Sequence, residues 1–315
     1  MTDRALPSEG WPPAVLDPAG PYSEPVTVLA WVLLLGGTLI LAIVLGALWI
    51  ALRGSPRLKT RLGGEKAIWI LGFAFPSVVL TGLLVWGLML TSSLSAARVP
   101  EGAMRVKVIG EMWWWRVHYQ DGQGRETLRD ANELHIPVGQ PVLLELEAAD
   151  VIHSFWVPRL GGKMDMIPGR TNRLLIEADA PGIYKGQCAE YCGGPHALMG
   201  FVVVAHTPAD FARWQASRLP SQGAGGEGLA LFLSSGCAAC HTIRGTPARG
   251  RAGPDLTHVG SRRTLGAGIL PNNPGTMAGW VADSQAIKPA NRMPAYHQFS
   301  GEELQALTAY LVSLK

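Results

Sequence analysis

Two long stretches without charge constrain the fold of this chain more than any other feature. No charged residue occurs between Glu24 and Arg53, and none occurs between Lys66 and Arg98. Each stretch exceeds the roughly 20 apolar residues that an α-helix needs to cross a bilayer. We therefore predict a pair of membrane-spanning helices rather than two buried core helices. The predicted spans are residues 26–52 and 67–90.

The charges beside these spans predict their orientation. The connection between them is mostly basic, whereas the first 24 residues are mostly acidic. Basic loops tend to stay on the cytoplasmic side of a membrane. We therefore expect residues 53–66 in the cytoplasm and both chain ends on the periplasmic side of a bacterial inner membrane, in a multi-pass arrangement. The first 25 residues lack the basic start and short apolar core of a secretory signal, so we expect the first helix to act as the insertion signal.

After the second span the chain changes character twice. From about residue 104 to 206, short runs rich in β-branched and aromatic residues alternate with turn clusters, a spacing typical of a β-sandwich or Greek-key barrel. A short amphipathic helix is predicted at residues 208–217, and a Gly-rich segment after it reads as a flexible linker. The remaining residues show helical periodicity interrupted by Pro and Gly, which predicts a small all-α domain.

These patterns divide the chain into five segments. They are an N-terminal periplasmic tail (1–25), a helical hairpin (26–97) with a cytoplasmic loop (53–66), a β-domain (98–217), a linker (218–226) and a helical domain (227–315). The β-domain has an excess of acidic side chains and the helical domain an excess of basic ones. Opposite charge would orient one domain on the other, and a short linker would keep their effective concentration high. Ordinary surface charge is the alternative explanation.

All four cysteines lie in two short segments. In the first segment, Cys188, Cys192, His196 and Met199 offer two thiolates, an imidazole and a thioether. Thiolate and thioether ligands favour copper and other soft metals, and imidazole suits copper and zinc. Two coppers bridged by both sulfurs would use every one of these ligands, together with a second imidazole. His153, on a predicted strand, can supply that imidazole.

Three other interpretations of this segment remain open. A disulfide between Cys188 and Cys192 is possible in an oxidising compartment, but it leaves the histidine and methionine without a role. Zinc could bind both thiolates, His196 and a distant histidine, again without using the methionine. A mononuclear blue-copper site needs only one cysteine.

The second cysteine segment is Cys237-Ala-Ala-Cys240-His241. In this spacing the two thiols attach to haem and the histidine becomes an axial ligand, which predicts c-type haem attachment. Zinc is the weaker alternative, because no second pair of Cys or His residues occurs at a suitable spacing. The chain therefore combines a predicted copper centre with a predicted haem.

With these residues the sequence resembles a known family. Residues 104–206 resemble subunit II of the haem-copper cytochrome c oxidases, through residues 150–158, 167–170 and 186–196 and through the order of hairpin and β-domain. The resemblance implies a cupredoxin fold with a dinuclear copper centre, CuA. The implied ligands are the side chains of His153, Cys188, Cys192, His196 and Met199 and the backbone carbonyl of Glu190.

The resemblance implies two further roles in the β-domain. In the family, the carboxylate of the loop glutamate reaches a magnesium ion at the border with subunit I, so Glu190 is a candidate magnesium ligand; a solvated loop residue is the alternative. Trp113 matches the tryptophan that passes electrons from cytochrome c to copper. Tryptophans near a bilayer also serve as interfacial anchors or packing residues.

Residues 227–315 resemble a class I cytochrome c domain, with a leading helix, Gly253-Pro-Asp-Leu-Thr257 after the haem segment, and a closing helix. Met277 and Met293 are the methionines of this domain. Met293, followed by proline, resembles the family's distal haem ligand, whereas Met277 lies in a helical pattern typical of the core. A Met/His pair raises the haem potential, which suits a donor to copper.

None of the eight histidines lies in a predicted span, so oxygen chemistry must occur in a partner. The resemblance implies the subunit through which electrons enter a caa-type cytochrome c oxidase, a respiratory oxidoreductase and translocase. This chain would pass electrons from cytochrome c through haem c and CuA to the catalytic subunit, without reducing oxygen itself. The expected partners are subunit I, subunit III, a cytochrome c donor and the lipid bilayer, with no nucleic acid.

Two other functions fit the same residues. Some nitric-oxide reductases use a similar CuA-bearing subunit, and nothing in this chain specifies the gas that its partner reduces. The chain could also be a stand-alone membrane redox protein that holds copper and haem. The intact copper ligands argue against a quinol oxidase subunit.

Overall fold

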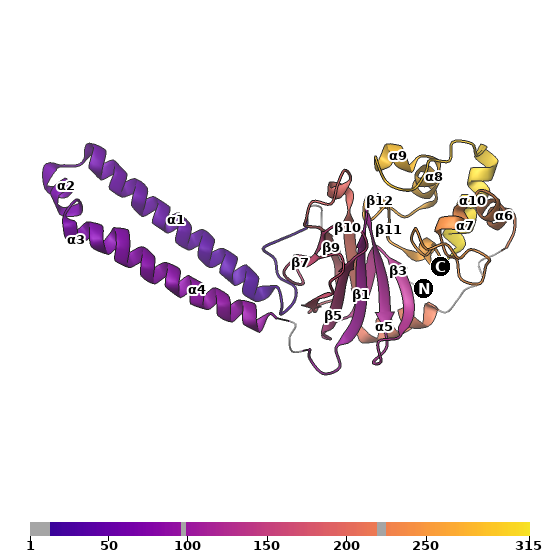
Figure 1. The fold of residues 1–315 in the computed structure, drawn as a ribbon, viewed down its shortest axis with the longest axis horizontal. Helices are drawn as coiled ribbons and strands as arrows, with labels where there is room; N and C mark the ends of the chain where they lie inside the picture. The colour runs from indigo at the N-terminus through magenta and orange to yellow at the C-terminus, as the bar shows by residue number, and fades with distance from the viewer. Residues whose placement is uncertain (1–12, 96–98, 219–224) are drawn as a thin grey trace. The chain divides into compact units, whose positions relative to one another are not determined.

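The computed structural model describes residues 13–95, 99–218 and 225–315. The chain forms two compact units, one from Met1–Ser23 with Arg98–Lys315 and the other from Glu24–Ala97 (Figure 1). Parts of the predicted tail (1–12), of the boundary between hairpin and β-domain (96–98) and of the linker (219–224) lie outside the described residues.

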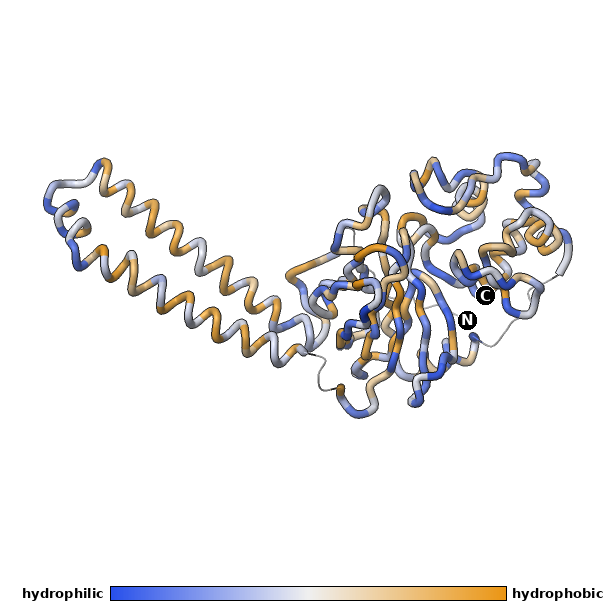
Figure 2. The backbone as a smooth tube through the Cα atoms, in the orientation of Figure 1, coloured by the Kyte–Doolittle hydropathy of each residue, from blue (hydrophilic) through white to orange (hydrophobic). Residues whose placement is uncertain are grey.

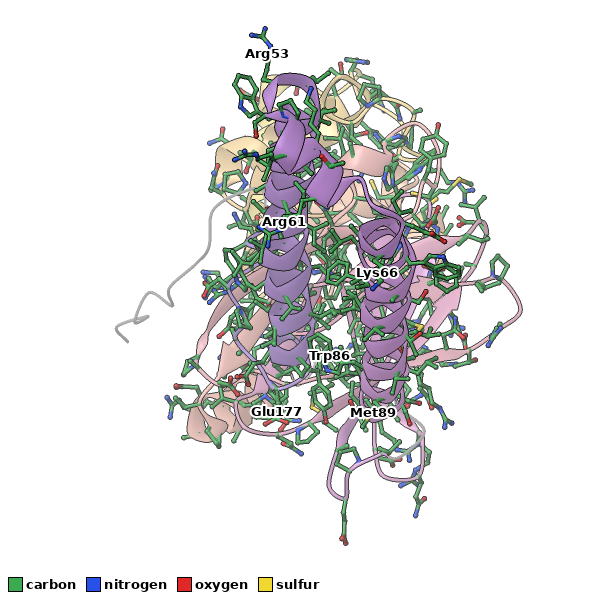
Figure 3. All side chains as sticks on the ribbon, turned by 90° about the vertical axis from the view of Figure 1, so that its left-hand side faces the viewer. Arg53, Arg61, Lys66, Trp86, Met89 and Glu177 are labelled. Atoms are coloured by element: carbon green, nitrogen blue, oxygen red, sulfur yellow. The ribbon has the colours of Figure 1, made fainter. Side chains whose placement is uncertain are left out.

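The smaller unit is a helical hairpin. Among the described residues, two helical segments are long and apolar enough to cross a membrane, Glu24–Arg53 and Glu65–Ser93. Apolar residues follow both helices along their length (Figure 2), and Arg53, Arg61 and Lys66 are spread over the connected end of the hairpin (Figure 3). The helical elements are α1 (Glu24–Arg53), α2 (Pro56–Leu62), α3 (Glu65–Ala67), a π-helical turn (Ile68–Ala74) and α4 (Phe75–Ser93).

The β-domain is a sandwich of two five-stranded sheets, with strand orders β3-β2-β1-β5-β8 and β4-β10-β9-β6-β7. The predicted cupredoxin-like fold class is confirmed. The strands are β1 (Met104–Glu111), β2 (Trp114–Gln120), β3 (Glu126–Ala131), β4 (Glu133–Pro137), β5 (Val142–Ala148), β6 (His153–Trp156), β7 (Met164–Met166), β8 (Asn172–Ile176), β9 (Gly182–Cys188) and β10 (Gly200–His206).

The core of the sandwich forms because alternate residues of each strand point inward. Strand β1 alternates buried and half-buried positions, with Val106 and Val108 fully buried. Trp115 packs edge-on against Phe155 of β6 and Phe201 of β10, and so joins the two sheets. Aromatic contacts of this kind stabilise a rigid frame beyond the effect of area burial alone.

The part of the N-terminal segment that is described packs on the sandwich. The backbone of Ala19 hydrogen-bonds to Arg159 and to Asp179, at 2.8 and 2.9 Å. The hydroxyl of Ser23 donates to the carbonyl of Arg159 at 2.6 Å. Residues 19–23 therefore belong to the β-domain structurally, which the sequence did not predict.

The C-terminal residues form the helical domain that the sequence predicts. Its core gathers around Phe232, Met277, Leu307 and Leu311. Two of its helices begin with a capping box. The side chain of the N-cap residue accepts the backbone N–H of the residue three positions later, and the side chain of that residue accepts the backbone N–H of the N-cap residue. The helices after the sandwich are α5 (Pro208–Ser217), α6 (Glu227–Ser234), α7 (Cys237–Cys240), α8 (Pro274–Ala282), α9 (Ser284–Ile287) and α10 (Gly301–Ser313).

Candidate metal centre and haem pocket

Two neighbouring strands bring the candidate metal donors together. His153 begins β6 and Cys188 ends β9, and these strands pair so that Phe155 lies opposite Cys188. The loop after β9 carries the remaining donors and returns to β10. A hydrogen bond of 2.9 Å from the Cys188 backbone N–H to the carbonyl of Met199 closes that loop. Sheet pairing therefore holds both ends of the site.

The two cysteine sulfurs lie 3.8 Å apart at the centre of the donor cluster. This distance exceeds the roughly 2.05 Å of a disulfide bond, and all four cysteines are free. Nδ1 of His153 lies 3.9 Å from Sγ of Cys188, and Nδ1 of His196 lies 3.5 Å from Sγ of Cys192. Sδ of Met199 is 3.8 Å from the same Cys192 sulfur.

This donor set fits a pair of soft metal ions. The ligand atoms of His153, Cys188 and Cys192 lie within 4.8 Å of one another, and all three side chains are buried. Each sulfur has its own imidazole, and the carbonyl oxygen of Glu190 lies 3.2 Å from Cys188 Sγ. One tetrahedral zinc ion would take four ligands and leave donors unused, whereas thiolates, thioether and imidazoles together suit copper.

Asp150 fixes the orientation of His153. Its carboxylate lies 2.9 Å from Nε2 of His153 and accepts the backbone N–H groups of Met112 and Val151, each at 2.8 Å. Burial alone would raise the pKa of Asp150, but the hydrogen bonds from His153 and the backbone lower it overall. The carboxylate thus stays ionised and leaves Nδ1 of His153 facing the sulfurs. Asp150 belongs to a motif that is visible in the sequence, but the sequence alone assigns no role to this residue.

Close packing also shapes the site. A Cβ atom on Gly110 of β1 would lie 2.8 Å from Cδ2 of His153, closer than side-chain atoms approach. Only glycine therefore lets the histidine ring lie against this strand. This constraint is not visible in a single sequence, where Gly110 is one glycine among many.

Glu190 presents two different groups to its surroundings. Its carbonyl oxygen faces the cysteine sulfur, whereas its half-exposed carboxylate lies 3.9 Å from Nζ of Lys163. At this separation the carboxylate is not held tightly by the lysine.

Trp113 lies directly against the metal loop. Its indole N–H donates to the carbonyl of Cys192 at 2.8 Å. A Cβ atom on Gly193, which has a φ of +113°, would lie 3.0 Å from the indole ring. The tryptophan therefore bonds the backbone of one of the paired cysteines and packs against the glycine that follows it.

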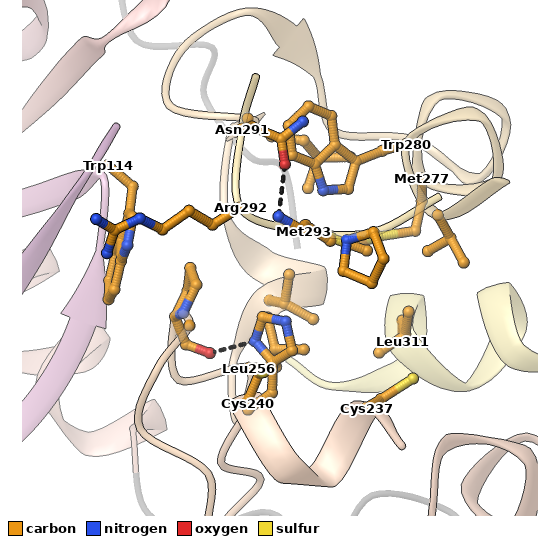
Figure 4. Close-up of a pocket in the computed structure, with 18 of the residues that line it drawn as sticks. Trp114, Cys237, Cys240, Leu256, Met277, Trp280, Asn291, Arg292, Met293 and Leu311 are labelled. Atoms are coloured by element: carbon orange, nitrogen blue, oxygen red, sulfur yellow. Dashed lines mark hydrogen bonds between the residues drawn. The ribbon is translucent and has the colours of Figure 1, made fainter. Parts of the chain in front are cut away.

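A cavity of about 450 Å³ lies beside α7 and is lined by residues of both the helical domain and the β-domain. Cys237, Cys240, His241 and Met293 all line it, so the structure brings the four predicted haem residues together (Figure 4). Nδ1 of His241 is 2.8 Å from the carbonyl of Pro254, which leaves Nε2 for a metal.

His241 and Met293 both line the cavity, and neighbouring groups hold each of them in place. A Cβ atom on Gly253 would lie 2.6 Å from Cε1 of His241, so glycine is required behind the ring. The Met293 backbone N–H donates to Oδ1 of Asn291 at 2.7 Å, and Gln285 donates to the Met293 carbonyl at 2.7 Å. These bonds hold the methionine loop at the cavity. Met277 also lines it but is packed within the helical core.

The remaining histidines of the helical domain are held away from the haem cavity. His258 is buried and lies 3.1 Å from the carbonyl of Lys315 and 3.2 Å from the guanidinium of Arg244. His297 is exposed and lies 3.8 Å from Asp283. Neither residue lines the cavity.

The helical domain contacts the β-domain through paired charges. Nε of Arg262 donates to Asp130 at 2.8 Å, and both side chains are buried. The backbone N–H of Arg263 donates to Glu133 at 2.9 Å. The first contact pairs an acidic side chain of the β-domain with a basic one of the helical domain, as the charge partition of the sequence predicts, whereas the second uses a backbone N–H.

Two family models match separate parts of the chain. The family model of the cytochrome c oxidase subunit II periplasmic domain matches residues 122–206, and that of cytochrome c matches residues 226–315. Cytochrome c oxidase subunit 2 of Alkalihalophilus pseudofirmus is 34% identical over 315 residues, covering 95% of this chain and 90% of that protein. The same subunit of Bacillus sp. (strain PS3) is 32% identical, covering 82% and 77%.

Among solved structures, the periplasmic domain of subunit II of cytochrome oxidase from Bradyrhizobium japonicum shares 31% identity. The match covers 38% of this chain and 96% of that one, with a TM-score of 0.36.

Proposed function

The chain belongs to the family of cytochrome c oxidase subunit II, and from this premise we propose which residues hold each electron carrier. It is the subunit through which electrons enter a terminal oxidase, a membrane-anchored component of an oxidoreductase complex with periplasmic domains. The family implies CuA in the β-domain and haem c in the helical domain.

The proposed CuA ligands are the buried cluster on β6, β9 and the following loop. They are His153, Cys188, Cys192, His196 and Met199, with the backbone carbonyl of Glu190. When bound, the copper pair supplies one-electron transfer with little change in bond length, because both sulfurs share the change in charge. The sheets hold the donors in place before the electron arrives, which keeps reorganisation small.

The proposed haem site uses Cys237 and Cys240 for covalent attachment and His241 and Met293 as axial ligands. The supporting observation is that all four line one cavity, with the histidine oriented by Pro254 and the methionine by Asn291. When bound, haem c supplies a second one-electron carrier whose potential the methionine raises.

We propose that electrons pass from an external cytochrome c to haem c, then to CuA, and then to haem in subunit I. Trp113 would carry electrons into the copper loop, because its indole N–H bonds the Cys192 carbonyl. Glu190 would place its carboxylate on a magnesium ion at the subunit I border. This chain would not itself reduce oxygen, since neither span contains a histidine to hold a catalytic metal.

The membrane arrangement is also a proposal. We place residues 53–66 in the cytoplasm and both ends in the periplasm, with two crossings, and we expect contact with subunits I and III. The proposed segments are 1–25, 26–97, 98–217, 218–226 and 227–315, with residues 19–23 of the first segment packed on the β-domain. Protease protection of inverted and right-side-out vesicles would test the orientation.

The pair of sulfurs 3.8 Å apart, with an imidazole beside each, carries the proposed copper assignment. Metal analysis and electron-spin resonance of the purified oxidase test it. We expect two coppers per chain with the mixed-valence signal, together with one c-type haem. Cys192→Ser should abolish the copper signal and leave the haem spectrum intact. Zinc, or one copper per fully loaded chain, would contradict the assignment.

A further inference from the structure

Lys288 is a buried cation at the contact between the two domains. It follows α9, its residue is 2% exposed, and its ammonium donates to the carbonyl oxygens of Trp113 at 2.7 Å and Gly266 at 3.0 Å. No ion pair found among residues 13–95, 99–218 and 225–315 includes it. A buried ammonium with no carboxylate partner is unfavourable unless its hydrogen bonds are needed.

Burial lowers the pKa of Lys288 to about 7, while the sulfur of Cys192 acts in the opposite direction. The lowered pKa agrees with the position of the ammonium, which is buried away from solvent and close to the metal loop. The side chain also lines the haem cavity. Lys288 is therefore near both proposed carriers.

Hydrogen bonds extend from Lys288 toward each carrier. On the haem side, Asn291 donates to the Lys288 carbonyl at 2.8 Å and accepts the Met293 backbone N–H at 2.7 Å. On the copper side, the lysine holds the carbonyl of Trp113, whose indole N–H donates to Cys192. A continuous series of contacts thus joins a proposed haem ligand to a proposed copper ligand.

This contact differs from the buried ion pair that also links the domains. The buried Arg262–Asp130 pair joins them through a side chain of β3, and neither residue touches Trp113 or the methionine loop in a described hydrogen bond. Electron tunnelling falls exponentially with distance, so a small shift between Met293 and Cys192 changes its rate greatly. A residue that bonds both sides directly is placed to set that distance.

We propose that Lys288 is a positioning residue for electron transfer between the two carriers: it holds Trp113 of the β-domain and the Met293 loop of the helical domain in one fixed arrangement. The proposal rests on the ligands assigned above. In its protonated form Lys288 also favours the reduced state of the nearby haem, and burial protects this effect from screening by salt.

The test compares Lys288→Met with Lys315→Met in the purified complete oxidase. Both variants remove one lysine charge from the helical domain, but Lys315 is exposed at the chain end. The readouts are the rate of copper reduction by haem c after rapid photoreduction, and the haem midpoint potential. We expect Lys288→Met to slow the transfer by about 10-fold or more, because small displacements of reacting groups have large effects on rate. Its haem potential should fall, and Lys315→Met should change neither.

A double-mutant cycle with Trp113→Phe tests whether the lysine acts through the tryptophan. If it does, Lys288→Met should slow transfer much less in the Trp113→Phe background than in the unsubstituted protein. Additive effects would contradict the proposed route. If Lys288→Met does not load haem, Lys288→Gln, which removes the charge but keeps a hydrogen-bond donor, should lower the haem potential and slow transfer less than loss of the donor would. An unchanged rate and potential in Lys288→Gln would contradict the proposal.

The controls separate this proposal from the function on which it rests. If the unsubstituted oxidase lacks the copper pair or c-type haem, the proposed ligand assignment fails. If both spectra are present and Lys288→Met transfers electrons at the unsubstituted rate with an unchanged haem potential, only the role of Lys288 is overturned.

Discussion

Nε2 of His153 and Oδ1 of Asp150 lie 2.9 Å apart, and this contact decides which ring nitrogen faces the cysteine sulfurs. The carboxylate is itself held by two backbone N–H groups, from Met112 and Val151. A histidine whose outer nitrogen is fixed in this way is oriented before metal binds and is a stronger donor. Copper affinity therefore depends on a residue that touches no metal.

Asp150→Asn should weaken copper binding by about 10- to 100-fold, because an amide orients the ring less strongly and does not raise its basicity. Competition with a copper chelator, followed by the copper absorption bands, measures the change. Asp179→Asn is the matched control, since Asp179 is exposed and remote from the cluster in its contacts. Unchanged copper affinity in Asp150→Asn would contradict the orienting role.

Gly110→Ala should disturb the copper centre without unfolding the sandwich. The added Cβ atom would lie 2.8 Å from the His153 ring, so the ring must move. We expect altered electron-spin parameters and lower copper occupancy, with the haem spectrum unchanged. Gly122→Ala is the control, because a Cβ atom there meets nothing within 4 Å. Identical copper spectra for both variants would show that the ring has room to shift.

Met293→Leu and Met277→Leu separate an axial ligand from a core residue. Both methionines line the haem cavity, but Met277 is 3% exposed and packed in the helical core. Met293→Leu should remove the thioether ligand, lower the haem potential and produce a high-spin optical spectrum. Met277→Leu should retain the low-spin spectrum and lose less than about 1.5 kcal/mol of stability. A high-spin spectrum in Met277→Leu and a low-spin spectrum in Met293→Leu would show that Met277, not Met293, is the haem ligand.

Asp130→Asn should destabilise the folded chain and alter its dependence on pH. Burial raises the pKa of Asp130, but Arg262, with His135 and Arg218, lowers it overall below 3.8. A carboxylate whose pKa is lower in the folded state contributes stability above pH 3.8 and loses it as the pH falls through the folded value. The unsubstituted chain should therefore lose this contribution below pH 3.8.

At pH 7 the variant leaves Arg262 buried without its partner, so we expect a loss of about 3–5 kcal/mol. Urea unfolding of the detergent-purified chain, followed by tryptophan fluorescence, measures this difference. The difference in free energy of unfolding between Asp130→Asn and the unsubstituted chain should become smaller as the pH falls below 3.8. Asp179→Asn should have the same free energy of unfolding as the unsubstituted chain. If the loss of stability in Asp130→Asn did not depend on pH, the ionised carboxylate would not be its cause.

Much of the fold follows from residue patterns that are local. Uncharged stretches predicted the hairpin, and α5 occupies the predicted residues Pro208–Ser217, where Thr207 caps the helix. Strands β3 and β9 do not belong to the runs rich in β-branched and aromatic residues that predict the β-domain. The first consists mainly of polar and charged residues, and the second contains glycines and a lysine, so neither has the composition typical of a strand. Pairing with neighbouring strands stabilises both.

Strand β4 shows why the buried polar residues could not be predicted. Glu133 and His135 are almost completely buried and bond each other at 2.8 Å. His135 also contacts His206 of β10 at 2.7 Å, and Glu133 accepts the backbone N–H of Arg263. Charged residues are rarely buried without such partners, and these come from distant parts of the chain.

The sequence by itself determined the kinds of donor, their order and the membrane segments. These depend on side-chain chemistry and short spacings, such as Cys237 to His241. Only the tertiary structure decided which atoms meet. Lys288 bonds the backbone of Trp113, 175 residues earlier, and Gly110 makes room for the ring of His153. Such contacts depend on how the whole chain closes upon itself, so no local pattern encodes them.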